Sequence, residues 1–269
     1  MNLPIHGDRR ETRRGVSRRF WDVVFFALRL IARRAKSATA VFGIFLIAGA
    51  IVAVAGTWGF AELARHVEAG STKAFDVSVM QWIGRHQDPA VQAVMLEITT
   101  LGTSTVVAAI VLVAAMFLWL SRHKHSAFLL CVATLGGIVL NNLLKLGFDR
   151  PRPQVFAWGT RAVSSSFPSG HAMSAAIAYS TVAYLAARLQ RNARSRVLTM
   201  VVAAVIVLLI CLSRLYLGVH YPSDVIAGVT IGLAWAAFCM AVLEATQLYA
   251  RRNAPELLLQ EKPAPPRGG

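Results

Sequence analysis

Long apolar runs, each ending in polar or charged residues, occupy most of this chain. Their apolar residues are massed together, without the alternation of a half-buried strand or the stripe of a surface helix. Runs of about 18 or more residues that almost lack charge are typical of transmembrane helices. Six runs fit this description: Thr39–Trp58, Thr103–Leu120, Ser126–Leu146, Gly170–Leu189, Val197–Leu217 and Asp224–Tyr249. The pattern predicts an all-α, polytopic membrane protein with six transmembrane helices.

A shorter segment between the first two runs has a different pattern. Phe75, Val79, Trp82 and Ile83 follow helical spacing, opposite a polar face that includes Asp76. Tryptophan is enriched where the membrane meets water. We therefore expect an outer interfacial amphipathic helix here, in addition to the six spans.

Composition agrees with a membrane location. Only 15% of the residues are charged and 56% are hydrophobic, whereas a soluble domain carries about 25% charged residues. The net charge of +15 is high enough to suit nucleic acid, but ten of the 28 Lys and Arg residues precede the first run. A basic segment beside a span is attracted to anionic lipid. We therefore expect membrane lipids as partners, and no nucleic acid.

The distribution of Lys and Arg also predicts an orientation, because these residues accumulate in cytoplasmic loops. With a cytoplasmic N-terminus, 20 of the 28 lie on the cytoplasmic side and eight on the other. We expect a basic cytoplasmic segment at 1–38, a six-span domain at 39–250 and a disordered, proline-containing cytoplasmic tail at 251–269. The loops after the third and fifth runs then face the exterior, which is the periplasm if the protein lies in a bacterial inner membrane.

Three short strings lie at the ends of these runs. The first ends the third run, the second opens the fourth run, and the third connects the fifth and sixth runs. They are Lys145-x6-Arg152-Pro153, Pro168-Ser169-Gly170-His171 and Ser213-Arg214-x5-His220-x3-Asp224. Because the third and fifth runs leave the membrane on the same side, all three strings can meet.

The first two strings suit an anion. Proline residues on both sides of Arg152 stop the helix, so the chain turns and Arg152 can return toward Lys145. The two cations can then flank a phosphate, which arginine binds through two nitrogens. Ser169 and Gly170 open a helix, where unpaired N–H groups attract anions. Each string alone has an ordinary alternative, namely basic side chains reaching the headgroups or a serine helix cap.

The third string suits covalent catalysis. His220 precedes Asp224 by four residues, which brings the carboxylate within reach of one ring nitrogen once helical geometry begins. The other nitrogen is then free to attack phosphorus. An Asp–His contact at a helix start is also common as a structural feature, so this prediction depends on the three strings occurring together.

In residue types, order and spacing, the three strings resemble the type 2 phosphatidic acid phosphatases. This is the lipid phosphate phosphatase branch of a superfamily that includes vanadium haloperoxidases and glucose-6-phosphatase, and the resemblance covers roughly residues 70–245. It implies that His220 forms a phosphohistidine, that Asp224 orients His220, and that His171 protonates the leaving lipid oxygen. It also implies phosphate binding by Lys145, Arg152, Ser169, Gly170 and Arg214.

The expected activity is hydrolysis of lipid phosphate monoesters or diphosphates at the outer face. Phosphatidic acid, phosphatidylglycerophosphate and undecaprenyl diphosphate are candidate substrates. Two alternatives stay open: a phosphotransferase that labels an acceptor other than water, and a non-catalytic protein that binds or transports lipid phosphates. The loops lack a carboxylate cluster suited to magnesium, and the three cysteines lie inside apolar runs without zinc spacing. We therefore expect no metal and no other cofactor.

Overall fold

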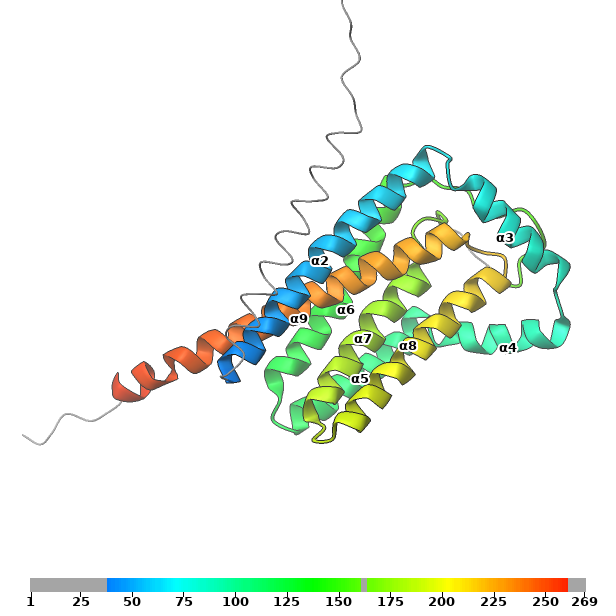
Figure 1. Cartoon of the computed structure of the whole chain (residues 1–269). Helices are drawn as coiled ribbons and strands as arrows, with labels where there is room; N and C mark the ends of the chain where they lie inside the picture. The colour runs from blue at the N-terminus through cyan, green and yellow to red at the C-terminus, as the bar shows by residue number, and fades with distance from the viewer. Residues whose placement is uncertain (1–37, 161–163, 261–269) are drawn as a thin grey trace, which may run out of the picture. The chain divides into compact units, whose positions relative to one another are not determined.

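The computed structural model describes residues 38–160 and 164–260, and every regular element in these ranges is an α-helix (Figure 1). The helices are α2 (Ala38–Glu68), α3 (Lys73–Arg85), α4 (Pro89–Thr100), α5 (Ser104–Leu120), α6 (Lys124–Gly147), α7 (Gly170–Leu189), α8 (Ala193–Tyr216) and α9 (Pro222–Gln260). The all-α prediction is confirmed for this part of the chain.

The chain divides into two compact units. One comprises residues 52–243, and the other combines residues 1–51 with residues 244–269. The basic segment predicted at 1–38 lies outside the described residues, apart from the first residue of α2. Helix α9 continues to Gln260, so residues 251–260, for which we predicted disorder, are helical. Residues 256–260 are good helix formers, and the helix continues to them through Pro255.

The six predicted spans correspond to six of the helices, of which α2 and α9 run at least ten residues past the expected ends. By length and composition, four helical segments among the described residues can cross a membrane: Leu46–Glu68, Lys124–Gly147, Ala193–Tyr216 and Pro222–Thr246. Helices α4 and α5, which meet at a 46° bend, make a fifth if they are counted as one span. The integral membrane character is therefore supported by four or five candidate spans.

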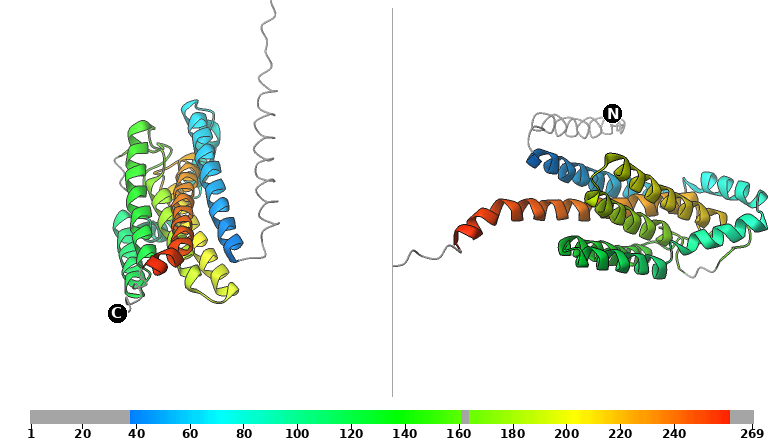
Figure 2. Two further views of the ribbon diagram at one scale, coloured as in Figure 1. Left: turned by 90° about the vertical axis from the view of Figure 1, so that its left-hand side faces the viewer. Right: turned by 90° about the horizontal axis from the view of Figure 1, so that it is seen from below.

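Helix α7 falls outside that set because it is rich in small residues. Ten of its 20 residues are buried, and six of these are alanine. It contacts α5, α6 and α8, and Figures 1 and 2 show α6, α7 and α8 side by side. A helix enclosed by other helices packs closely through small side chains and does not need a strongly apolar surface.

Two glycines bring the start of α9 against the start of α7. A Cβ on Gly228 would lie 2.6 Å from the Ser169 carbonyl oxygen, and one on Gly232 would lie 2.8 Å from the Met173 carbonyl oxygen. Only glycine permits such a close backbone approach. The Ser169 amide also donates to the Asp224 carbonyl oxygen at 3.0 Å. The second and third strings are thus joined through their backbones.

Helices α3 and α4 lie outside the six predicted spans. Phe75 and Trp82 of α3 are 56% and 62% exposed, while Met80 and Ile83 are buried. Asp76, which we had assigned to the polar face, is completely buried, because it has charged and polar partners on α9 and in the loop after α6. Helix α4 was not predicted as a separate element, although its Asp88 cap and first-position proline are typical of a helix start.

Candidate functional site

The three predicted strings meet where α6 ends, α7 begins and α8 passes into α9. His171 of the second string interacts electrostatically with Lys145 and Arg152 of the first string and with Arg214 and His220 of the third. All of these residues belong to the unit formed by residues 52–243. The structure therefore brings the strings together, as their common side of the membrane predicted.

Arg152 and Lys145 are held by oxygen atoms of two loops, the one after α6 and the one between α8 and α9. The Arg152 guanidinium donates to the carbonyl oxygens of Ser164 at 2.8 Å, Val219 at 2.7 Å and Ser165 at 3.3 Å. The Lys145 Nζ donates to the Ser164 hydroxyl at 2.8 Å. These partners are neutral, so they orient the two cations without neutralising them.

Arg214 is the most deeply buried of the three phosphate-binding cations that we predicted, with only 4% of its surface exposed. Its Nη1 donates to the Thr99 hydroxyl of α4 at 2.9 Å, and its Nε has no hydrogen-bond partner among the described residues. Within the described ranges, neither Arg214 nor Lys145 nor Arg152 forms an ion pair with a carboxylate. Because unpaired buried charge is costly, this cluster is suited to receive an anion.

Ser169 and Gly170 form the start of α7. The Ser169 hydroxyl does not cap this helix, and its oxygen is buried without a hydrogen-bond partner in the part of the chain that the structure describes. The ordinary alternative of a serine cap is therefore wrong. Asn141 lies beside Gly170, since a Cβ there would be 3.2 Å from Asn141 Nδ2, and the Asn141 Oδ1 is likewise buried without a partner within residues 38–160 and 164–260. We had overlooked Asn141, although it precedes Lys145 by one helical turn on α6.

His220 has only 2% of its surface exposed. Its Nδ1 is 2.8 Å from the Ser166 carbonyl oxygen, whereas the Asp224 Oδ2 is 3.6 Å away. The sequence predicted that Asp224 would orient this ring, but 3.6 Å is too long for a hydrogen bond. A carbonyl oxygen can only accept, so Nδ1 carries the proton and Nε2 is left with its lone pair. This lone pair accepts a hydrogen bond from Arg152 Nη1 at 3.3 Å.

The charge state of His220 follows from its surroundings. Burial lowers the pKa of His220 to about 4, and the charges of Arg214 and Arg152 also lower it, while nearby Asp224 acts in the opposite direction. The imidazole is therefore neutral at neutral pH. A neutral imidazole with an unprotonated Nε2 has the protonation state that a nucleophile needs.

Asp224 is completely buried and accepts three strong hydrogen bonds. Its donors are Arg150 Nη1 at 2.5 Å, the Ser166 hydroxyl at 2.5 Å and the Tyr221 amide at 2.8 Å. We had counted Arg150 only among the basic residues of the outer face, and we had not considered Ser166. Neither residue has a spacing to the third string that would have revealed its contact with Asp224.

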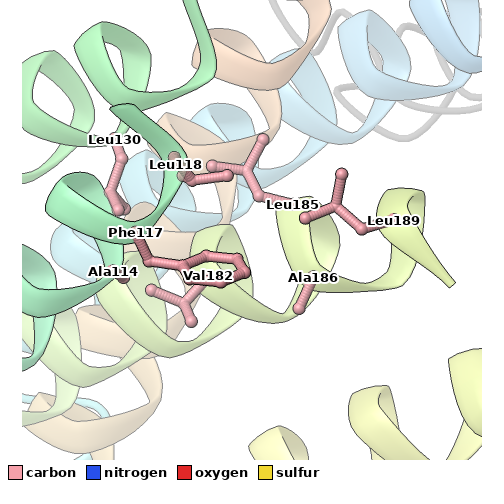
Figure 3. Close-up of a pocket in the computed structure, with 8 residues that line it drawn as sticks. All are labelled: Ala114, Phe117, Leu118, Leu130, Val182, Leu185, Ala186 and Leu189. Atoms are coloured by element: carbon pink, nitrogen blue, oxygen red, sulfur yellow. The ribbon is translucent and has the colours of Figure 1, made fainter. Parts of the chain in front are cut away.

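Two further observations delimit the site. Among the described residues, no group of three or more His, Cys, Asp and Glu side chains is arranged to hold a metal ion. A cavity of about 300 Å³ opens between α5, α6 and α7, and its lining is entirely apolar (Figure 3). Leu118 near the end of α5, Leu130 near the start of α6 and Leu189 at the end of α7 line it. This cavity is therefore at the opposite helix ends from the three strings.

Comparison with known proteins agrees with this geometry. Residues 126–247 match the model of the PAP2 superfamily. The chain is 31% identical to phosphatidylglycerophosphatase B of Bacillus subtilis over 65% of its own length and 86% of that protein. It is 27% identical to an undecaprenyl-diphosphatase of Sulfolobus acidocaldarius over 64% and 80% of the two chains.

A solved structure is also similar. The crystal structure of a transmembrane PAP2-type phosphatidylglycerolphosphate phosphatase from Bacillus subtilis superposes with a TM-score of 0.68 and 28% sequence identity. The match covers 72% of this chain and 96% of that one. The similarity thus includes nearly the whole of the solved chain.

Proposed function

The chain belongs to the PAP2 superfamily, and on this basis we propose that it is a membrane-integral lipid phosphatase that works through a phosphohistidine on His220. The proposed substrates are lipid phosphate monoesters or diphosphates. The names of both relatives, phosphatidylglycerophosphatase B and undecaprenyl-diphosphatase, support this class.

One observation carries the proposal. The unprotonated Nε2 of a neutral histidine accepts from Arg152, in a cluster of cations that have no carboxylate partner within ion-pair distance among the described residues. A protein that only binds phosphate needs the cations but has no use for a buried nucleophile with a defined tautomer. The geometry therefore favours a phosphatase over the non-catalytic alternative.

In the first step, the lone pair of His220 Nε2 attacks phosphorus while Lys145, Arg152, Arg214, Ser169 and the Gly170 amide hold the phosphate oxygens. The bond from phosphorus to the lipid oxygen breaks, and protonated His171 gives its proton to that oxygen. The products are phosphohistidine, neutral His171 and a free lipid alcohol, or a lipid monophosphate if the substrate is a diphosphate. Preorganised cations stabilise the charge on the transferring group.

In the second step, neutral His171 removes a proton from a water molecule, and the water oxygen attacks phosphorus. The P–N bond breaks, its electron pair returns to Nε2 of His220, and inorganic phosphate leaves. His171 is protonated again, so the cycle is balanced. Throughout, the Ser166 carbonyl keeps the proton on Nδ1, and Asp224 supplies negative charge next to the ring.

We further propose that α7 is a sixth span, enclosed by its neighbours, and that α3 rests on the outer membrane surface through Phe75 and Trp82. The excess of Lys and Arg on the other side supports cytoplasmic termini and a site that faces the periplasm or exterior. A green fluorescent protein fused to the C-terminus should then fluoresce in bacterial cells, and an alkaline phosphatase fused there should be inactive. The reverse pattern would contradict the proposed orientation.

The activity is tested by measuring phosphate release from a panel of lipid monophosphates and diphosphates with the purified full-length protein. We expect turnover of at least one lipid, no loss with EDTA, and complete loss in His220→Ala. His125→Ala, an exposed histidine at the start of α6, is the matched control and should remain active.

The same assay separates the alternatives. Turnover that survives in His220→Ala would refute the phosphohistidine, and inhibition by EDTA would contradict the metal-free mechanism. Consumption of lipid phosphate with labelling of an added alcohol, and without free phosphate, would identify a phosphotransferase. Binding of the lipids without any turnover would identify a binding or transport protein.

A further inference from the structure

We propose that Asp76 and Arg150 are positioning residues for the reaction, and that α3 is thereby a working part of the active site. This inference rests on the proposed function, because it assigns to Asp76 and Arg150 the task of setting the net charge beside the attacking His220. Neither residue belongs to the three strings. Along the sequence, most of the candidate spans lie between Asp76 and Asp224.

Arg150 bridges two buried carboxylates. Its Nη2 donates to Asp76 Oδ2 at 2.8 Å, and its Nη1 donates to Asp224 Oδ1 at 2.5 Å. Nη1 also lies 2.7 Å from the Ser223 hydroxyl, and the guanidinium stacks on the Tyr221 ring at 4.4 Å. Arg150 is therefore held from several sides in one orientation.

Asp76 is tied to the start of α9 as well. Its Oδ1 accepts from the Ser223 amide at 3.0 Å, and its Oδ2 accepts from the Ser223 hydroxyl at 2.6 Å. Both Asp76 and Asp224 are completely buried. The network thus runs from α3 through Arg150 and Ser223 to Asp224, the carboxylate beside His220, and both of its carboxylates are buried.

The charges in this network explain why a second carboxylate is present. Arg150 carries one positive charge, so with Asp224 alone it would form a neutral pair. Burial acts to lower the pKa of Arg150, but the two carboxylates outweigh burial and raise it, so the guanidinium stays charged. With Asp76 included, the group of three has a net charge of minus one.

That remaining negative charge matters when Nε2 bonds to phosphorus. The ring keeps its proton on Nδ1 and so gains positive charge as the new bond forms. A negative neighbour at 3.6 Å stabilises the charged ring more than the neutral one. Asp76 therefore acts at a distance: by balancing Arg150, it leaves the charge of Asp224 available to His220.

The test compares Asp76→Asn with Glu97→Gln, which removes an exposed carboxylate from the neighbouring α4. For Asp76→Asn we expect kcat to fall by about 10- to 100-fold, while KM and the inhibition constant of inorganic phosphate change less than about threefold. Rapid quenching into alkaline detergent, in which the P–N bond of phosphohistidine survives, should show a matching fall in the rate of phosphoenzyme formation. Glu97→Gln should leave kcat and KM unchanged.

A merely structural role predicts a different result. If Asp76 only supported the fold, the phosphate inhibition constant would rise together with the loss of kcat, because the cation cluster would be disturbed too. That outcome, or an unchanged kcat in Asp76→Asn, would overturn the inference. Loss of activity in His220→Ala is independent of it, so failure of the inference and failure of the proposed function are distinguishable.

Two further variants complete the experiment. In an Asp224→Asn background, the additional Asp76→Asn substitution should lower kcat by less than about threefold, because the effect of Asp76 passes through Asp224. Equal losses in both backgrounds would refute the inference.

If Asp76→Asn does not fold, Arg150→Lys provides the measurement. Lysine keeps the charge but cannot bridge both carboxylates. For this variant, kcat should fall at least about tenfold while KM is retained. A normal kcat in Arg150→Lys would overturn the inference.

Discussion

Replacing Gly228 with alanine should strongly lower kcat/KM, although it alters no side chain proposed to contact the substrate. The added Cβ would lie 2.6 Å from the Ser169 carbonyl oxygen and 3.3 Å from the Met173 amide nitrogen. Both neighbours are backbone atoms, which cannot rotate away as a side chain can. The clash is therefore relieved only if the start of α9 moves away from the start of α7.

The required movement can be obtained from the contact distances. Ordinary contact begins at 3.4 Å, so the oxygen and the new carbon must separate by about 0.8 Å. The hydrogen bond from the Ser169 amide to the Asp224 carbonyl, now 3.0 Å, spans the same interface and would be stretched or broken. A misplacement of about 1 Å can cost about 100-fold in rate, and overpacking costs about 1–3 kcal/mol of stability.

We therefore expect kcat/KM of Gly228→Ala to fall by about 30- to 100-fold, with a lower Tm in detergent. Gly147→Ala is the control, because the same methyl group at the end of α6 would have no heavy atom of the described residues within 4 Å. It should retain activity within about twofold, since an alanine is tolerated in a helix. Wild-type kcat/KM in Gly228→Ala would refute the claim that this close approach aligns the second and third strings.

Two other predictions concern His220 and Arg214. Because the neutral form of His220 is the nucleophile and its pKa is about 4, the acid limb of kcat/KM, corrected for the substrate's own ionisation, should lie near pH 4, with activity falling as pH drops through it. An acid limb near 6.5 would contradict this. Thr99→Val removes the hydroxyl that orients Arg214 and should lower kcat/KM by about 5- to 10-fold, the equivalent of about one hydrogen bond. Thr100→Val, at the exposed neighbouring position, should behave like the parent, and an equal loss in both variants would show that the Arg214 contact has no specific role.

Much of the helical architecture was predictable because bilayer thickness imposes it. An apolar run long enough to cross the hydrocarbon must form its hydrogen bonds internally, and only a helix achieves this within one segment. The bounds of α5, α6 and α7 therefore agree with the runs within two residues. The least accurate prediction was the end of α9, where helix propensity continues past the apolar residues.

The outer elements were less predictable, because their burial depends on partners distant in the sequence. Local periodicity placed Asp76 on a polar face, as is normal for an exposed helix. Its actual environment is a buried ion pair with Arg150, and no spacing between the two residues indicates that pairing. The same reason hid the contact between Ser166 and His220.

The sequence by itself determined which residues can do chemistry here: the apolar runs specify helices, and the strings at their ends put cations, histidines and an aspartate on one side of a membrane. The tertiary structure decided how these residues are connected. In the folded protein, the Nδ1–H of His220 donates to the Ser166 carbonyl oxygen, and the Asp224 Oδ2 lies 3.6 Å from the same nitrogen. Arg150 links Asp224 to α3. Hydrogen bonds and charge balance act over a few ångströms of space, and only the packing of the helices brings such distant parts of the chain within that range.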